Sequence, residues 1–287
     1  MTARVSFADQ SKRLGIALGW IGVYAVVGVG VAVGAYLLLP AWGGTAGSLA
    51  RYGVAELLGV GTATVVVGRL LNKHSWEQLG WRRDGLALRL ARGIGLGALM
   101  AALAIGLAVA LDRASVRSTH DWSRWPAVAL PLVIGLLCAA LAEELMFRGY
   151  PLRRLADAVG PAPAMAVLAV LFGLAHAKNP SATVFSTVNV ALAAVWLSFA
   201  FFSTGGMALA WGLHFGWNAG LALLFDAPVS GLPFNVPAVE YAPGAHAWVD
   251  GGAFGPEGGV VTTLVMILGT LAIVGTRLKQ PRRWLAA

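Results

Sequence analysis

Three stretches of the sequence place side chains that can transfer protons or donate hydrogen bonds inside otherwise apolar runs. They are Glu143-Glu144-x-x-x-Arg148, Phe172-x-x-x-His176 and His214-x-x-x-Asn218. A carboxylate can act as a general base, and a neutral histidine can orient or share the proton. A second histidine together with an asparagine can donate hydrogen bonds to a developing oxyanion. Residues of these types, if they meet, suit the activation of a water molecule.

Helical spacing divides the first stretch into a pair and a single carboxylate. Glu144 and Arg148 are four residues apart, so on a helix they share a face and can form an ion pair. Glu143 is rotated about 100° from that face and points elsewhere. A charge near mid-bilayer costs about 2.5–3.5 kcal/mol, so these charges need pairing, a polar cavity or a place near the interface. The alternative is that all three only cap an interfacial helix end.

The composition places these residues in a polytopic membrane protein. Of 287 residues, 58% are hydrophobic and only 12% are charged, with a mean hydropathy of +0.73. Soluble domains are typically about 25% charged. The net charge is +8, but the basic residues lie between apolar runs and form no basic face interleaved with aromatics, which argues against a nucleic-acid partner. Cys138 is the single cysteine, so an intrachain disulfide is excluded.

Eight apolar runs are near the length of about 20 residues that a helix needs to cross a bilayer. The sequence therefore predicts an all-α membrane bundle of about eight transmembrane helices, as one integral-membrane domain over residues 1–287. The three polar stretches lie within residues 126–225. Residues 226–259, rich in proline and glycine, are expected to form a loop. The runs are 14–39, 49–71, 90–111, 126–148, 160–178, 183–202, 206–225 and 260–276.

Lysine and arginine in the connecting segments predict the orientation. One set of alternating segments carries thirteen basic residues and the other carries four. Cytoplasmic segments are enriched in lysine and arginine, so both termini are expected in the cytoplasm of a multi-pass cell-membrane protein. Glu143, Glu144 and Arg148 would then lie at the cytoplasmic end of the fourth helix, beside a recessed cavity in the cytoplasmic half. The thirteen are Arg4, Lys12, Arg13, Lys73, Arg82, Arg83, Arg89, Arg153, Arg154, Arg277, Lys279, Arg282 and Arg283.

Helix rise sets a condition on this site. If the fifth helix enters the membrane at Pro161, His176 lies about 22 Å along it, deeper than Glu143 on the fourth helix. The two residues can meet only if the fifth helix begins below the membrane surface or tilts strongly, or if the fourth extends past Gly149.

For other polar and small residues in the apolar runs, the sequence predicts structural contacts. Arg51 and Glu56, five residues apart in the second run, are expected to pair loosely. Asn189 in the sixth run can line the cavity or bridge helices. Gly93 and Gly97 in the third run favour close packing against another helix.

The three stretches, in this order on separate apolar helices, resemble the CAAX-protease and bacteriocin-processing family of intramembrane endopeptidases, called CPBP or Abi. That family includes the type II CAAX prenyl proteases. The motifs match without departure and cover roughly Val128 to Leu224. The resemblance implies hydrolysis of a peptide bond of a membrane-associated polypeptide, in a cavity open to the cytoplasm. Residues 126–225 would form the catalytic core.

The resemblance also implies roles for the site residues. Glu143 and His176 would activate water, His214 and Asn218 would bind the oxyanion, and Glu144 and Arg148 would support them. A metalloprotease site is also open, in which Glu143, His176 and His214 hold Zn²⁺ and lower the pKa of its bound water. Asn218 is a poor zinc ligand, which suits the oxyanion role. A metal-free, glutamate-dependent mechanism is the other possibility.

Two other classes of function use the same residues. A proton-coupled membrane transporter would use Glu143 and the histidines as a proton relay, but the sequence has no internal repeat of the kind common in transporters. A non-enzymatic membrane immunity or scaffold protein would retain the residues without the chemistry. The protease hypothesis predicts a peptide or protein substrate and the lipid bilayer as the partners.

Overall fold

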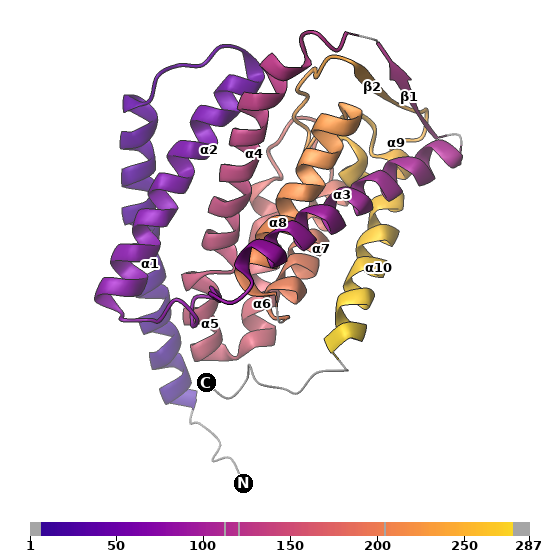
Figure 1. Cartoon of the computed structure of the whole chain (residues 1–287). Coiled ribbons are helices and arrows are strands. Elements are labelled where there is room, and N and C mark those ends of the chain that lie inside the picture. The colour runs from indigo at the N-terminus through magenta and orange to yellow at the C-terminus, as the bar shows by residue number, and fades with distance from the viewer. Residues whose placement is uncertain (1–6, 112, 120, 204, 278–287) are drawn as a thin grey trace.

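Helices occupy the positions of all eight apolar runs in the computed structural model, which describes residues 7–111, 113–119, 121–203 and 205–277 (Figure 1). The π-helical segments η1 (Thr64–Leu71) and η2 (Gly220–Leu224) extend α2 and α8. The prediction of an all-α membrane bundle is confirmed. The eight helices are α1 (Phe7–Leu38), α2 (Gly44–Ala63), α3 (Leu86–Ala110), α4 (Trp125–Phe147), α6 (Pro161–Ala175), α7 (Val184–Phe201), α8 (Gly206–Ala219) and α10 (Val260–Arg277).

The lengths and surface of these helices fit a multi-pass membrane protein. Among the described residues, five helical stretches are long and apolar enough to cross a membrane, and α6 and α10 are shorter apolar helices. Large apolar side chains such as Val26, Leu99 and Leu130 are more than 60% exposed on the outside of the bundle. Such side chains suit contact with lipid tails. The five stretches are Ala8–Leu38, Gly44–Leu71, Leu86–Ala110, Trp125–Val159 and Val184–Phe201.

Glycines bring the main helix pairs into close contact. A Cβ atom added at Gly97 of α3 would lie 2.3 Å from the carbonyl oxygen of Leu213 on α8, and one at Gly93 would lie 2.6 Å from that of Leu209. Gly53 of α2 meets α4 at the carbonyl oxygen of Gly135 in the same way, at 2.6 Å. Small residues allow this approach, as membrane helix packing requires. The close packing expected at Gly93 and Gly97 is confirmed.

The chain turns within the bundle between α4 and α6. After α4 ends at Phe147, it continues through the half-buried helix α5 (Tyr150–Val159) and turns at Gly160 into α6. Gly160 has a positive φ of 91°, a conformation that glycine adopts without strain. α6 therefore starts beyond the end of α4 and returns alongside it. α4 itself ends before Gly149, and the separate helix α5 carries the chain further before α6 begins.

Residues 226–259 fold over one end of the bundle. β2 (Val239–Pro243) pairs antiparallel with β1 (Ala114–Ser118), and the short helices α9 (Ala247–Asp250), η3 (Gly252–Phe254) and η4 (Pro256–Gly258) follow. This end is opposite to the first turn of α1 and the last turn of α10 (Figure 1). Asn189 of α7 donates to the carbonyl oxygens of Glu257 and Gly259 and accepts from Thr263. Of its two expected roles, Asn189 therefore has the bridging one.

Candidate active site

A buried chain of charged groups fixes His214 at the centre of the site. Arg148 donates to Glu144 Oε1 at 3.1 Å, and His214 Nδ1 lies 2.9 Å from the same oxygen. Because a carboxylate accepts hydrogen bonds, Nδ1 carries the proton. Arg148 also donates to the carbonyl oxygen of Ala194 and lies over the ring of Phe172. The predicted ion pair is present, with Glu144 0% and Arg148 1% exposed. The second contact of Glu144, with Nδ1 of His214, orients the imidazole ring.

Glu143 points away from this pair, as the helical spacing predicts. Its Oε2 lies 3.7 Å from Nε2 of His214, the ring nitrogen that Glu144 does not occupy. That oxygen is buried and has no hydrogen-bond partner among the described residues. The side chain is 23% exposed and faces a cavity. Glu143 therefore presents to the cavity a carboxylate oxygen that a bound molecule can contact.

His176 lies at the C-terminal end of α6, and a backbone carbonyl of the same helix sets the orientation of its ring. Its Nδ1 lies 2.8 Å from the carbonyl oxygen of Phe172, so Nδ1 donates and Nε2 is left as an acceptor. The ring also packs on that of Phe172, with centroids 4.7 Å apart. Within the described part of the chain, no ion-pair contact joins His176 to Glu143. Glu143 thus approaches His214 more closely than the partner His176 that was expected.

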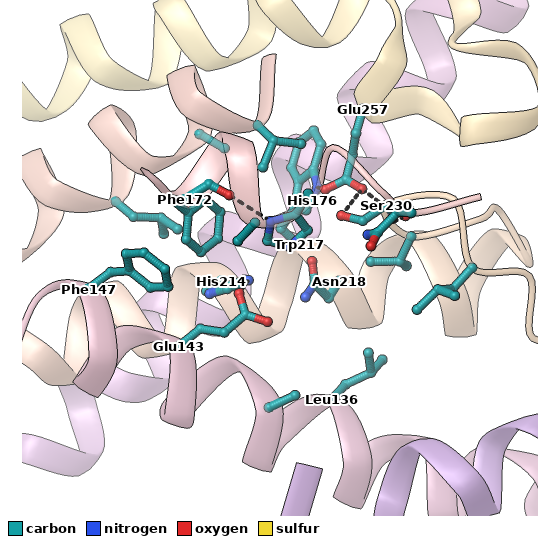
Figure 2. Close-up of a pocket in the computed structure, with 18 of the residues that line it drawn as sticks. Leu136, Glu143, Phe147, Phe172, His176, His214, Trp217, Asn218, Ser230 and Glu257 are labelled. Carbon is teal, nitrogen blue, oxygen red and sulfur yellow. Dashed lines mark hydrogen bonds and ion pairs between the residues drawn. The ribbon is translucent and has the colours of Figure 1, made fainter. Parts of the chain in front are cut away.

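The predicted residues surround one cavity of about 300 Å³. Glu143, His176, His214 and Asn218 all line it, from α4, α6 and α8, and Figure 2 shows them grouped around a common space. Apolar and aromatic side chains form much of the remaining wall, including Leu136, Phe147, Phe172, Trp196 and Trp217. A mostly apolar cavity with a few convergent polar groups is typical of a binding site for an organic ligand.

The site lies near the middle of the bundle. Tyr24, halfway along α1, donates to the carbonyl oxygen of Leu145 at 3.3 Å, and Ala194, which accepts from Arg148, is near the middle of α7. Glu143 and Glu144 do occupy the last turn of α4, but α5 carries the chain further, so that turn is not at the end of the bundle. Arg148 and His214 contact Glu144 there, and His214 Nε2 faces Glu143.

The cavity extends from this level toward residues 226–259. Val229, Ser230, Leu232, Phe234 and Glu257 from that segment line it. The segment lies at the end of the bundle away from the start of α1 and the end of α10. The expectation of a cavity in the cytoplasmic half stays a prediction, because it depends on the orientation of the chain in the membrane.

Sequence reasoning missed the polar wall that the long loop contributes. Glu257 accepts hydrogen bonds from Trp217 Nε1 at 3.0 Å and from the backbone and hydroxyl of Ser230. Asn179, just after α6, donates to the carbonyl oxygen of Ser230. These bonds hold the loop against the cavity beside His176 (Figure 2). A glutamate in a Pro-Glu-Gly loop is expected to be exposed, so nothing in the sequence indicates that Glu257 is buried.

A second difference concerns α2. Arg51 donates to the carbonyl oxygen of Tyr36 and stacks on its ring, 4.1 Å from the centroid, rather than pairing with Glu56. The expected Arg51–Glu56 pair is therefore wrong, because the two side chains leave α2 on different faces. Glu56 instead lines the cavity.

Among the described residues, the side chains that were expected to bind a metal are not brought together. Across the described ranges, no three His, Cys, Asp or Glu side chains lie close enough together to hold a metal ion. Glu143 and His214 are adjacent, but His176 is not grouped with them. The zinc site of Glu143, His176 and His214 stays a prediction, and no step below passes through a metal.

The comparison with known families bears on this set of residues. Residues 124–220, about a third of the chain, match the family model described as type II CAAX prenyl endopeptidase Rce1-like. The predicted family resemblance is confirmed. The matched segment runs from α4 to the start of η2 and contains all six predicted site residues. It supports a CAAX-type membrane protease with a peptide substrate. No curated protein and no solved structure matches the chain.

Proposed function

We propose that this protein is an intramembrane endopeptidase that hydrolyses a peptide bond of a membrane-associated polypeptide. The observation that carries the proposal is the unpartnered Oε2 of Glu143, 3.7 Å from His214 Nε2 in a cavity shared with His176 and Asn218. A carboxylate, two imidazoles and an amide in a largely apolar cavity supply a base and hydrogen-bond donors. The Rce1-like match is consistent with this chemistry.

Glu143 is the general base in this proposal. A water molecule between Glu143 and His176 gives a proton to the Glu143 carboxylate while its oxygen attacks the carbonyl carbon of the substrate. His176 accepts a hydrogen bond at Nε2, because its Nδ1 proton is held by Phe172. When the tetrahedral intermediate collapses, the carbon–nitrogen bond breaks and the leaving amine takes the proton from Glu143. Atoms and charges then balance over the cycle.

His214 and Asn218 stabilise the oxyanion. The Asn218 amide donates to the substrate oxygen, and His214 donates from Nε2 in its doubly protonated form. The carboxylates of Glu143 and Glu144 flank that ring, so a positive imidazolium is electrostatically compatible with its surroundings. Arg148 and Glu144 are positioning residues, because they act through the orientation of His214. Donors fixed before the reaction avoid reorganisation in the transition state.

The substrate reaches the site laterally from lipid or from one face of the membrane. Tyr52 of α2 lines the cavity and is also 55% exposed on the outside of the bundle, which supports a lateral path. In this proposal both termini lie in the cytoplasm, an orientation that the distribution of basic residues supports. Arg4, Lys279, Arg282 and Arg283, which contribute to that distribution, lie outside the described residues.

The test is the Glu143→Gln variant in a peptide-cleavage assay. Purified protein in proteoliposomes is incubated with a diverse peptide library, and new termini are read by mass spectrometry. Loss of the base should lower the rate of cleavage by about 100-fold or more. Glu77→Gln, the same change at an exposed loop position, is the matched control and should leave cleavage within about twofold of the wild type. Equal cleavage by wild type and a well-folded Glu143→Gln would refute the proposal.

A further inference from the structure

Glu56 is a charged residue of the cavity wall that neither the three motifs nor the family match includes. It lies on α2, outside residues 124–220, yet it lines the cavity with Glu143. Its Oε2 atom is buried and has no hydrogen-bond partner among the residues that the structure describes. An unpaired polar group at this depth is costly, so a partner that binds there gains a strong interaction.

The ionisable groups nearest to Glu56 are acidic. Glu56 interacts electrostatically with Glu143 on α4, and Tyr52, one turn away on α2, interacts with both carboxylates. Of the described residues that line the cavity, three are glutamates and none is a lysine or arginine. Arg148 is close by but is committed to Glu144 and Ala194. Glu257 is likewise committed to Trp217 and Ser230.

We propose that Glu56 is a specificity-determining residue that binds a positively charged side chain of the substrate next to the bond that is cleaved. A lysine or arginine side chain in the cavity would donate to the unpartnered Oε2 of Glu56, on the wall that Glu56 shares with Glu143. Attraction between opposite charges is stronger in such a protein interior than in water. The inference rests on the proposed endopeptidase function and adds the class of its substrate, a polypeptide with a basic residue at the cleavage site.

The position of Glu56 limits where the basic residue lies in the substrate. An extended peptide advances about 3.3 Å per residue, so a charge held beside Glu143 belongs to a residue within about two positions of the cleaved bond. Tyr52 is half-exposed at the surface of the bundle, and Glu56 follows it on the same helix. Tyr52 and Glu56 are four residues apart and share a helix face, so a substrate that enters alongside Tyr52 meets the side of α2 that carries Glu56.

The experiment compares wild type, Glu56→Gln, Glu56→Asp, Glu143→Gln and the control Glu77→Gln on the peptide library described above. For wild type and Glu77→Gln, lysine and arginine should be enriched about tenfold within two positions of the cleaved bond, the size expected for one charged hydrogen bond. Glu56→Gln should lose this enrichment, so that basic and neutral residues occur around its cleavage sites in the proportions of the library. Glu56→Asp, which keeps the charge, should retain part of it.

Kinetics on one cleaved peptide separate recognition from a structural role. Acetylation of its lysine, which removes the charge, should raise KM for wild type about tenfold with little change in kcat. In Glu56→Gln the KM values for the acetylated and unmodified peptides should be the same within about twofold. The effect of acetylation on KM is measured with the wild-type protein alone. This part of the test therefore does not depend on whether Glu56→Gln folds.

Two results would overturn the inference while leaving the proposed function in place. One is the absence of basic enrichment around the wild-type cleavage sites, and the other is an unchanged enrichment in folded Glu56→Gln. Undiminished cleavage by folded Glu143→Gln is a different failure, because it removes the proposed function itself. The Glu143 and Glu56 variants therefore report on the two claims separately.

Discussion

At the scale of single residues, the site depends on the buried carboxylate of Glu144, which contacts two side chains. Glu144 Oε1 accepts from both Arg148 and His214, so it neutralises a buried guanidinium and orients an imidazole with the same atom. Removing one member of a buried charge pair leaves the other uncompensated, which is far more costly than losing an exposed pair. Stability and activity are thus coupled through Glu144.

Replacing Arg148 by methionine tests this coupling. Arg148→Met should lower the free energy of unfolding by about 3–5 kcal/mol, because Glu144 stays buried without its main partner. Arg153→Met, which breaks the partly exposed Arg153–Asp157 pair on α5, is the matched control and should cost about 1 kcal/mol or less. Thermal unfolding in detergent measures both. The double variant Glu144→Gln/Arg148→Met should cost less than the sum of the single changes, and a strictly additive cost would contradict the pairing.

Asp226, in the loop after η2, predicts a pH dependence of stability. Burial raises the pKa of this carboxyl to about 6, although a hydrogen bond from the Val236 backbone opposes the shift. Because the folded-state pKa lies above the unfolded one, the stabilisation is complete below about pH 4 and is lost as the pH rises through about 6. Between pH 4 and pH 7.5 the wild type should lose about 1 kcal/mol more than Asp226→Asn, after allowance for solvent screening. Parallel pH profiles of the melting temperature would refute this.

At the scale of helices, α8 is positioned by the glycines of α3. Gly97 lies against the backbone at Leu213 and Trp217, the residues that directly precede His214 and Asn218 on α8. The distance between α3 and α8 therefore fixes where the histidine stands relative to Glu143. Close packing of small residues sets this distance, since membrane helices lack a hydrophobic driving force for association.

A single methyl group on α3 tests this arrangement. In Gly97→Ala the new Cβ would lie 2.3 Å from the Leu213 carbonyl oxygen, so α8 must move, at a cost of about 1–3 kcal/mol and with slower cleavage. Gly95→Ala, two residues away, meets nothing within 4 Å and should be neutral or slightly stabilising, because alanine favours a helix. Melting temperature and kcat together check the pair of variants. Equal effects at both positions would show that the contact does not position α8.

Periodicity and hydropathy predicted the helices and the motifs well, and they predicted the non-local contacts poorly. The eight apolar runs became helices, and i,i+4 spacing separated Glu144 and Arg148 from Glu143. The pairing of Glu143 with His214 rather than with His176 depends on how α4, α6 and α8 cross. Burial of Glu257 and the position of Glu56 depend on a loop and a helix that carry no motif. The spacing of residues in the sequence determines local geometry only, so these contacts can be seen only in the packed bundle.

At the scale of the whole molecule, the orientation in the membrane decides which side the cavity faces. The cavity extends toward residues 226–259, at the end of the bundle opposite the start of α1 and the end of α10. Basic residues are concentrated in the segments at the end with the termini. If that end is cytoplasmic, the covered end of the cavity faces away from the cytoplasm, and a cytoplasmic substrate must enter through the side of the bundle.

Cysteine labelling in intact cells tests the orientation. In a Cys138→Ala background, which has no other cysteine, Trp248→Cys on α9 and Lys12→Cys on α1 introduce single exposed thiols at opposite ends. A membrane-impermeant maleimide should label position 248 in intact cells and position 12 only after permeabilisation, because segments rich in lysine and arginine are expected in the cytoplasm. The reverse pattern would place the covered end of the cavity in the cytoplasm. Lateral entry past Tyr52 would then no longer be required for a cytoplasmic substrate.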